Sequence, residues 1–356
     1  MAISNSEFTF LAVGDIMLSR NVAAKMVKAK NPLLPFSQLE ELLLNTDFNL
    51  GNLESPFSGK DSYPQTGSLV FNAPRWAMQG LREYNFKVLS LANNHTLDQG
   101  LKGLIYTKNY LTQNNIQAIG VGQNLTETWQ PAVIEAKGVK IGFIAVSYAS
   151  LNDNGKKTNN NVARIEDLAN LKTAITQAKV LADLVVVNMH AGTEYKHKPN
   201  SAQIKFAHAA VDYGADLVIG HHPHWVQTVE KYNGSPPHPA CKKSSFDNPV
   251  TVKDGKKYQA LDLGNGCGGK YIFYSLGNFI FDQMWSTKTR QGLAVKFTVK
   301  VDSQTSDTKA VLNKAELIPV IIDNYSTPRL ANVVESQAIL KSIGVVDEVI
   351  DLSPDN

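Results

Sequence analysis

The sequence predicts an α/β protein whose C-terminal half is mostly β-structure. Over the first 220 residues, short β-branched runs alternate with amphipathic segments of helical length, a pattern typical of βαβ units around a buried sheet. After residue 224 the alternation ceases, and the runs Tyr271–Phe281 and Leu293–Val301 predict antiparallel strands. Hydrophobic residues make up 43% of the 356 residues and charged residues 19%, which is sufficient for a sizeable core.

The strands expected in the first part are short apolar runs that precede polar residues. They cover Thr9–Val13, Phe48–Leu50, Lys87–Leu91, Ile116–Ile119, Lys140–Val146, Leu184–Asn188 and Asp216–Ile219. The expected helices are amphipathic segments between these strands, and they cover residues 20–30, 36–45, 74–84, 100–114, 165–181 and 200–213. Pro74 suits the first turn of a helix, and Asn115 and Gly214 are typical of helix ends.

One large domain with an inserted loop is expected. Residues 233–270 are rich in Gly, Pro, Ser, Lys and Asn, and they predict a long excursion between two strands rather than a linker. The polar run Asp302–Asp307 predicts a hairpin loop. We therefore expect a single domain over residues 1–330 and a helical tail over residues 331–356.

Charge and apolar patterning exclude some classes of protein. The 35 basic and 32 acidic residues give a net charge of only +3, so we expect no nucleic-acid partner. No apolar run has the length of a membrane span, and the first seven residues lack the basic region of a signal peptide. An export signal or anchor outside this sequence stays open.

The two cysteines, Cys241 and Cys267, both lie in the polar excursion. Two free thiols are the default interpretation. A single disulfide that closes this loop is the alternative, and it requires an oxidising compartment.

Five expected strands run into residues that can bind metals or transfer protons. In chain order, these strand ends carry Asp15, then Asn52 and Glu54, then Asn94 and His95, then His190, and finally His221, His222 and His224. Because the C-terminal ends of the strands in an open α/β sheet face one crevice, we expect these side chains to line one cavity.

This set of donors predicts a metal centre. Imidazole, carboxylate and amide oxygen suit Zn, Mn or Fe(II). Taken alone, Asp15 and Asn94 are each compatible with a turn, and His190 with a hydrogen-bonded core residue. The run His221–His224 is harder to explain by packing, because apolar residues would fill a core better than its three imidazoles.

Six ordered blocks within about residues 8–285 carry most of these residues. They are GDIMLSR (14–20), NLE (52–54), ANNHTLDQG (92–100), HAGTEY (190–195), GHHPH (220–224) and SLGNFIFDQ (275–283). With these blocks the chain resembles the CapA-type poly-gamma-glutamate capsule biosynthesis proteins, distant relatives of the calcineurin-like metallophosphoesterases. The resemblance implies a calcineurin-like fold, a four-layer α/β/β/α sandwich of two sheets flanked by helices, with one or two divalent transition metal ions (Mn, Zn or Fe).

The resemblance also implies roles for individual residues. The implied metal ligands are Asp15, Glu54, Asn94, His190 and two of His221, His222 and His224, among which the spacing of the family's closing pair favours His222 and His224. The implied catalytic residues are His95, Asp98 and Arg20. The residues expected to bind substrate are Arg20, Asn52, Glu194 and Asn278.

Two positions depart from the wider phosphoesterase pattern. Met17 stands where that pattern has a histidine, and Thr96 stands where an acidic residue follows the catalytic histidine, with Asp98 the nearest acid. We therefore expect one of the two metals to be weakly bound or absent.

Arg20 lies five residues after Asp15, at the start of an expected helix. Its planar fork of donors suits a phosphate or a carboxylate at the mouth of the metal site. The alternative is a surface arginine that pairs with a nearby acid.

The resulting expectation is a metal-dependent hydrolase, in which metal activates water and polarises the scissile group while His95 acts as general acid. Its substrate would be a phosphoester, or an ester or amide linked to poly-gamma-glutamate or a capsule polymer. The alternative is a non-catalytic accessory component of a polyglutamate synthesis and export assembly that holds polymer in the metal pocket. The expected partners are an anionic small molecule or polymer and a membrane-associated capsule assembly, and the expected location is extracytoplasmic or membrane-associated.

Overall fold

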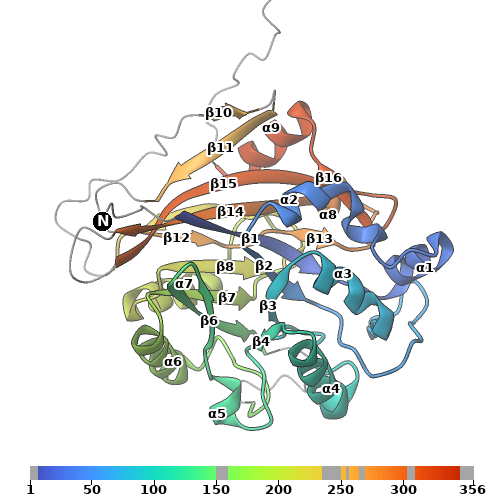
Figure 1. The fold of residues 1–356 in the computed structure, drawn as a ribbon, viewed down its shortest axis with the longest axis horizontal. Helices are drawn as coiled ribbons and strands as arrows, with labels where there is room; N and C mark the ends of the chain where they lie inside the picture. Colours follow the sequence, from blue (N-terminus) through green and yellow to red (C-terminus); the bar gives the residue numbers. More distant parts are fainter. Residues whose placement is uncertain are drawn as a thin grey trace, which may run out of the picture.

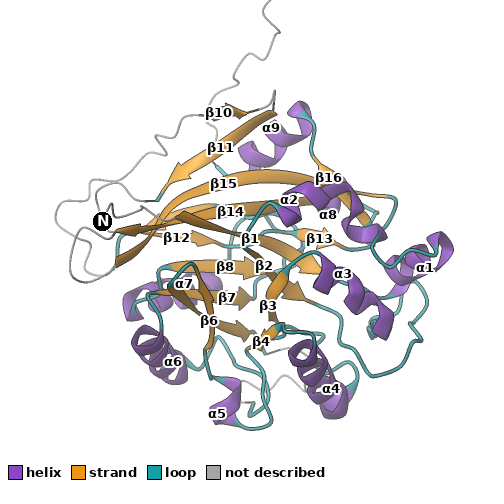
Figure 2. Ribbon diagram, in the orientation of Figure 1, coloured by secondary structure: helices purple, strands orange, loops and turns teal. Residues whose placement is uncertain are grey.

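The computed structural model describes residues 7–149, 159–234, 250–253, 256–263, 269–302 and 309–344. Within them, two β-sheets share a core, and helices cover their outer faces (Figure 1, Figure 2). This arrangement confirms the expected α/β class and the sandwich flanked by helices. Cys241 and Cys267 lie outside the described residues, so their bonding state stays a prediction.

The large sheet combines a parallel and an antiparallel part. Its parallel strands are β1 (Glu7–Ile16), β2 (Phe48–Leu53), β3 (Phe86–Ser90) and β4 (Gln117–Ile119). Beyond β1 follow the antiparallel strands β14 (Gln291–Asp302), β15 (Lys309–Asp323), β11 (Lys256–Asp262) and β10 (Val250–Lys253). Two short strands complete this sheet, β13 (Asn278–Ile280) beside β1 and β16 (Thr327–Leu330) beside β15.

The small sheet has a parallel centre and two antiparallel edges. Its order is β5 (Ala132–Ala136), β6 (Val139–Ser147), β7 (Leu184–His190), β8 (Leu217–His221), β12 (Lys270–Phe273) and β9 (Val229–Tyr232). The inner faces of the two sheets meet through aromatic pairs such as Phe48 with Phe143 and Phe273 with Phe297. This shared apolar layer fixes the two sheets against each other.

Two amphipathic helices, α6 (Leu168–Leu181) and α7 (Ser201–Tyr213), cover the outer face of the small sheet. Helix α7 begins at a capping box made by Asn200 and Gln203 and ends at Gly214, whose φ of 112° suits glycine. The other helices are α1 (Arg20–Ala29), α2 (Glu40–Leu44), α3 (Met78–Glu83), α4 (Gly100–Gln113), α5 (Leu125–Thr128), α8 (Thr287–Arg290) and α9 (Val333–Ser342). No helix among the described residues is long and apolar enough to cross a bilayer.

Some expected elements differ from the observed ones. The helix expected at 36–45 is a 3-10 segment, η1 (Leu34–Leu39), followed by α2, and α3 is likewise preceded by a 3-10 turn, η2 (Arg75–Ala77). Such turns are common at helix N-termini. The strand expected over Tyr271–Phe281 is wrong, because the chain divides there into β12 and β13, which belong to different sheets. Each pairs in parallel with one neighbour, and Gly277 turns the chain between them with a φ of 68°.

Residues 274–277, here called the crossover, carry the chain from the small sheet to the large one. The N–H of Asp15 donates to the carbonyl of Gly277, and the N–H of Leu276 donates to the carbonyl of Gly220, both at 3.0 Å. A Cβ on Gly14 or on Gly220 would lie 1.9 Å from a carbonyl oxygen of the crossover. These two glycines therefore allow the backbone contact that holds β1 and β8 together at their C-terminal ends.

We predict that Gly14→Ala and Gly220→Ala each lower the free energy of unfolding by about 1–3 kcal/mol or more, because the added methyl group overpacks a backbone contact. Urea unfolding measures the effect. Gly142→Ala in β6 is the matched control, since the nearest atoms to its Cβ would be the side-chain Cβ atoms of Ala178 and Ala182, at 3.2 and 3.4 Å. A loss at Gly14 or Gly220 no larger than that at Gly142 would contradict the prediction.

Candidate metal centre

The polar strand ends meet where the C-terminal ends of β1, β2 and β3 of the large sheet face those of β7 and β8 of the small sheet. Five segments thus come together, as the sequence predicts. The expectation of a crevice along one open sheet is wrong, because the donors come from two sheets. The crossover supplies the physical reason, since it joins the ends of β1 and β8.

Asn52 lies at the centre of the cluster. Its Nδ2 donates to Asp15 Oδ1 at 2.8 Å and lies 3.1 Å from His190 Nδ1 and 3.4 Å from Glu54 Oε2. Its Oδ1 accepts a hydrogen bond from Asn93 Nδ2 at 3.1 Å. One fully buried amide therefore orients donors from both sheets.

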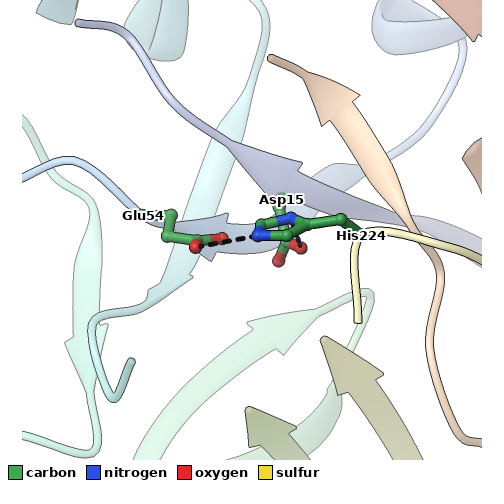
Figure 3. Close-up of side chains that lie close together, drawn as sticks. All are labelled: Asp15, Glu54 and His224. Atoms are coloured by element: carbon green, nitrogen blue, oxygen red, sulfur yellow. Dashed lines mark ion pairs between the residues drawn. The ribbon is translucent and has the colours of Figure 1, made fainter. Parts of the chain in front are cut away.

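Asp15, Glu54 and His224 form the tightest group (Figure 3). Each offers an atom within 4.8 Å of the atoms offered by the other two. His224 Nδ1 lies 3.4 Å from Asp15 Oδ2, and its Nε2 lies 3.8 Å from Glu54 Oε1. Such converging oxygen and nitrogen atoms are the arrangement that a divalent cation requires.

His190 and Asn94 bring further donors to the same cluster. His190 Nε2 lies 2.7 Å from Asn94 Oδ1, and its ring centroid lies 4.8 Å from that of His222. Tyr148 lies against His222 with ring centroids 4.6 Å apart. The imidazoles of His190, at the end of β7, and His222, directly after β8, are therefore in contact, with their planes tilted by 52°.

His221 and His222 carry buried ring nitrogens that no described residue satisfies. Both nitrogens of His221, which is fully buried, and Nδ1 of His222 lack a hydrogen-bond partner among the described residues. Burial lowers the pKa of His221 to about 4 and that of His222 to about 3. They are therefore neutral imidazoles at neutral pH, which is the form that binds metal ions.

The pKa values of the two carboxylates depend on burial and on the charges of neighbouring groups. Burial, and then the charge of Asp15, raise the pKa of Glu54 well above its ordinary value. Burial alone would also raise the pKa of Asp15, but the hydrogen bond from His224 and the charges of His221 and His224 lower it overall. The same bond raises the pKa of His224 against the effect of its own burial. A cation among these groups would offset the carboxylate repulsion.

Four residues around the cluster have left-handed backbone. Arg20, Tyr195, His222 and His224 have φ angles of 44°, 61°, 100° and 56°. Left-handed backbone is uncommon for residues other than glycine and costs free energy, and six further non-glycine residues among those described also adopt it.

His95 lies beside the cluster and is oriented by an acid. Its Nδ1 lies 2.8 Å from Asp98 Oδ2, and because a carboxylate only accepts, Nδ1 donates. Its Nε2 lies 3.9 Å from Glu54 Oε1. The ring of Phe71 is stacked on the imidazole with centroids 3.9 Å apart. Asp98 therefore orients the imidazole of His95.

Arg20, Asn52 and Asn278 are engaged by other residues of the protein. Arg20 does not lie on the surface, because its guanidinium is buried in an ion pair with Asp282. Asn278 Oδ1 lies 2.8 Å from His224 Nδ1, and its Nδ2 donates to the carbonyl of Thr289. These contacts, like those of Asn52, favour an orienting role over substrate contact. Glu194 is exposed beside the cluster, where its charge contributes to the raised pKa values of Glu54 and Tyr195.

Some residues around the site escaped sequence reasoning. Asn93, beside Asn94, donates a hydrogen bond to Asn52. Phe71 is stacked on His95, and Tyr148 lies against His222. Asp282 pairs with Arg20. Asp282 lies within the block SLGNFIFDQ, so the sequence did point to the segment that contains it. Phe71 and Tyr148 lie in segments without any such signal.

Taken together, these residues fit a divalent transition metal. Three kinds of atom converge on one region: ring nitrogens of buried neutral imidazoles and Glu54 Oε1, all without a hydrogen-bond partner among the described residues, and the oxygens of Asp15. Leaving such atoms unpaired in a protein interior costs free energy. The residues that can hold metal are Asp15, Glu54, Asn94, His190, His221, His222 and His224.

Comparisons with known sequences agree with the resemblance. The family described as "Bacterial capsule synthesis protein PGA_cap" matches residues 9–283. The PGA biosynthesis protein CapA of Bacillus subtilis (strain 168) is 31% identical over 290 residues, which cover 81% of this chain and 67% of that protein. The capsule biosynthesis protein CapA of Bacillus anthracis is 28% identical over 349 residues, which cover 95% and 73%. A probable polyglutamine synthesis accessory protein of Mycobacterium tuberculosis (strain ATCC 25618 / H37Rv) is 28% identical over 63% of each chain.

Some solved structures are distantly similar to this chain. A novel phosphatase from Mycoplasma pneumoniae has 15% identity and a TM-score of 0.47, and the match covers 96% of this chain and 100% of that one. A putative 5'-nucleotidase from Staphylococcus aureus has 13% identity, a TM-score of 0.49, and coverage of 95% and 58%. Neither similarity is strong enough to assign an activity to this chain.

We predict that the purified protein binds Mn, Zn or Fe, and that His190→Ala or the double change of His222 and His224 to Ala lowers the bound metal several-fold. The physical reason is that each change removes imidazole donors from a buried set. Metal analysis by mass spectrometry after dialysis measures the content.

The matched control is His208→Ala, the same chemical change at a histidine that pairs with Glu230 outside the cluster. Its metal content should equal that of the unchanged protein. Less than about 0.2 equivalents in the unchanged protein, with no uptake on titration with these ions, would contradict a metal centre.

Proposed function

The chain belongs to the bacterial capsule synthesis protein family PGA_cap, and we propose that it is a metal-dependent hydrolase. The proposed substrate is a phosphoester, or an ester or amide bond linked to poly-gamma-glutamate or a capsule polymer. The observation that carries the proposal is the set of buried atoms of Glu54, His221 and His222 that lack a hydrogen-bond partner in the part of the chain that the structure describes, next to Asp15 and His224. A fold needs no such set for its own stability.

The metal, when bound, would polarise the scissile group and make water a better nucleophile. Hydrolysis also needs a proton for the leaving oxygen or nitrogen. His95 is suited to supply it from Nε2, because Asp98 engages Nδ1 and fixes the ring. Asn52 and Asn278 hold Asp15 and His224 in place during the reaction.

An anionic substrate fits the electrostatics of the proposed site. One or two divalent ions at the cluster would attract a phosphate or a carboxylate. The names of the Bacillus relatives link them to PGA and capsule biosynthesis, which supports a glutamate polymer as the larger substrate. From the same names, we propose that the protein is extracytoplasmic or membrane-associated and that its partner is a capsule synthesis assembly.

The second candidate function is accessory and not catalytic. It is favoured by the name of the Mycobacterium tuberculosis relative, a probable accessory protein of polyglutamine synthesis. In this case the same metal pocket would hold polymer without cleaving it. The His95–Asp98 pair distinguishes the two candidates, because simple binding of polymer does not require an oriented proton donor.

We predict that metal-loaded protein hydrolyses at least one compound in a screen of generic phosphoesters, esters and glutamyl amides with added Mn²⁺, Zn²⁺ or Mg²⁺. His95→Ala should keep its metal and lose turnover by roughly 10²-fold or more, the usual scale for an acid–base residue. Initial rates and metal analysis on the same preparations measure both quantities.

His208→Ala again serves as the control and should retain full turnover, since its partner is Glu230. Loss of metal together with turnover in His95→Ala would make His95 a ligand. No hydrolysis by fully metal-loaded protein would reject the hydrolase in favour of the accessory function.

A further inference from the structure

A short segment, residues 68–72, passes next to His95 and is held by several hydrogen bonds. Here it is called the strap. Arg20 Nη1 donates to the carbonyl of Ser68 at 2.9 Å, and the N–H of Asn72 donates to Ser19 Oγ at 3.2 Å. In between, Gln99 Nε2 donates to the carbonyl of Phe71 at 2.7 Å. The strap is therefore held by α1 and by the loop that carries His95.

Phe71 of the strap and His95 share one carboxylate oxygen. Asp98 Oδ2 accepts from the N–H of Phe71 at 2.5 Å and from His95 Nδ1 at 2.8 Å. The two rings are stacked with an interplanar angle of 20°, and their residues are only 2% and 8% exposed. The hydrogen bond fixes one edge of the imidazole, and the phenyl ring covers one of its faces.

The guanidinium of Arg20 contacts the phenyl ring of Phe71. Its guanidinium carbon lies 4.6 Å from the centroid of Phe71 and 5.8 Å from that of Phe281, within cation–π range. Its Nη2 donates to Asp282 in a buried ion pair. The left-handed backbone of Arg20, with a φ of 44°, is a strain that the protein tolerates to place this side chain.

We propose that Phe71 is a positioning residue for His95, and that the ion pair of Arg20 with Asp282 holds Phe71 in its place. The stacked ring keeps water from one face of the imidazole and keeps Nε2 on the side of Glu54, where their separation is 3.9 Å. The effect on catalysis rests on the proposed hydrolase function, whereas the effect on the position and protection of His95 does not.

The test measures carbethoxylation of His95 by diethyl pyrocarbonate at fixed pH, followed by peptide mass spectrometry. Phe71→Leu removes the ring but keeps an apolar side chain, and should speed labelling of His95 by at least about threefold. Phe71→Tyr retains the stacked ring and should label at the original rate. Arg20→Gln should also speed labelling, because the neutral amide loses the ion pair and the cation–π contact.

Phe57→Leu is the matched control, since it removes another fully buried ring that lies against Tyr110. His208, whose side chain is 28% exposed, serves as an internal reference in every variant. Equal labelling of His95 in Phe71→Leu and the unchanged protein would overturn the proposal. Equal acceleration in Phe57→Leu, or acceleration in Phe71→Tyr as large as in Phe71→Leu, would also overturn it. No acceleration in Arg20→Gln would remove Arg20 from the proposal.

A kinetic measurement separates this proposal from the proposed function. Where hydrolysis is found, Phe71→Leu should lower kcat about tenfold while metal content and KM stay unchanged, because only the proton donor is misplaced. Where no hydrolysis is found, the labelling result still decides whether Phe71 positions His95. An unchanged kcat alongside faster labelling would overturn the catalytic part of the proposal.

Discussion

The backbone contact at the crossover is the constraint on which the rest of the site depends. Gly14 and Gly220 lie so close to residues 274–277 that no other side chain fits, and each directly precedes a metal-ligand candidate, Asp15 or His221. Because the crossover bonds to the ends of both β1 and β8, donors from two sheets are drawn into one cluster. The shared core holds the two sheets together, and this contact fixes Asp15 next to His221 within that frame.

Burial gives the cluster its chemical character. Asp15, Glu54 and His221 are completely buried, so their charges and lone pairs must be satisfied within the protein or by a ligand. Asn52 donates to Asp15, while both ring nitrogens of His221 lack a hydrogen-bond partner among the described residues. This mixture of carboxylate and imidazole donors is of the kind that binds divalent cations in proteins.

Sequence reasoning identified the ligand candidates better than the residues that orient them. The strand-end pattern singled out Asp15, His190 and the histidine run because each follows a strand, although these strands belong to two sheets. Arg20 was expected at an open mouth, but the ion pair with Asp282 draws it inside. Phe71 was not identified from the sequence, because no sequence pattern indicates that an apolar loop residue contacts a distant imidazole.

The sequence by itself determined the α/β class, the order of most strands and helices, and the donor types, because periodicity and strand-end chemistry are local properties. Only the tertiary structure decided that the donors belong to two sheets, that Asn278 orients His224, and that Phe71 covers His95. These features depend on contacts between residues far apart in the sequence, such as His222 with Asp15, which are 207 positions apart. Local patterns do not encode such contacts, since they arise when the shared core brings the two sheets together.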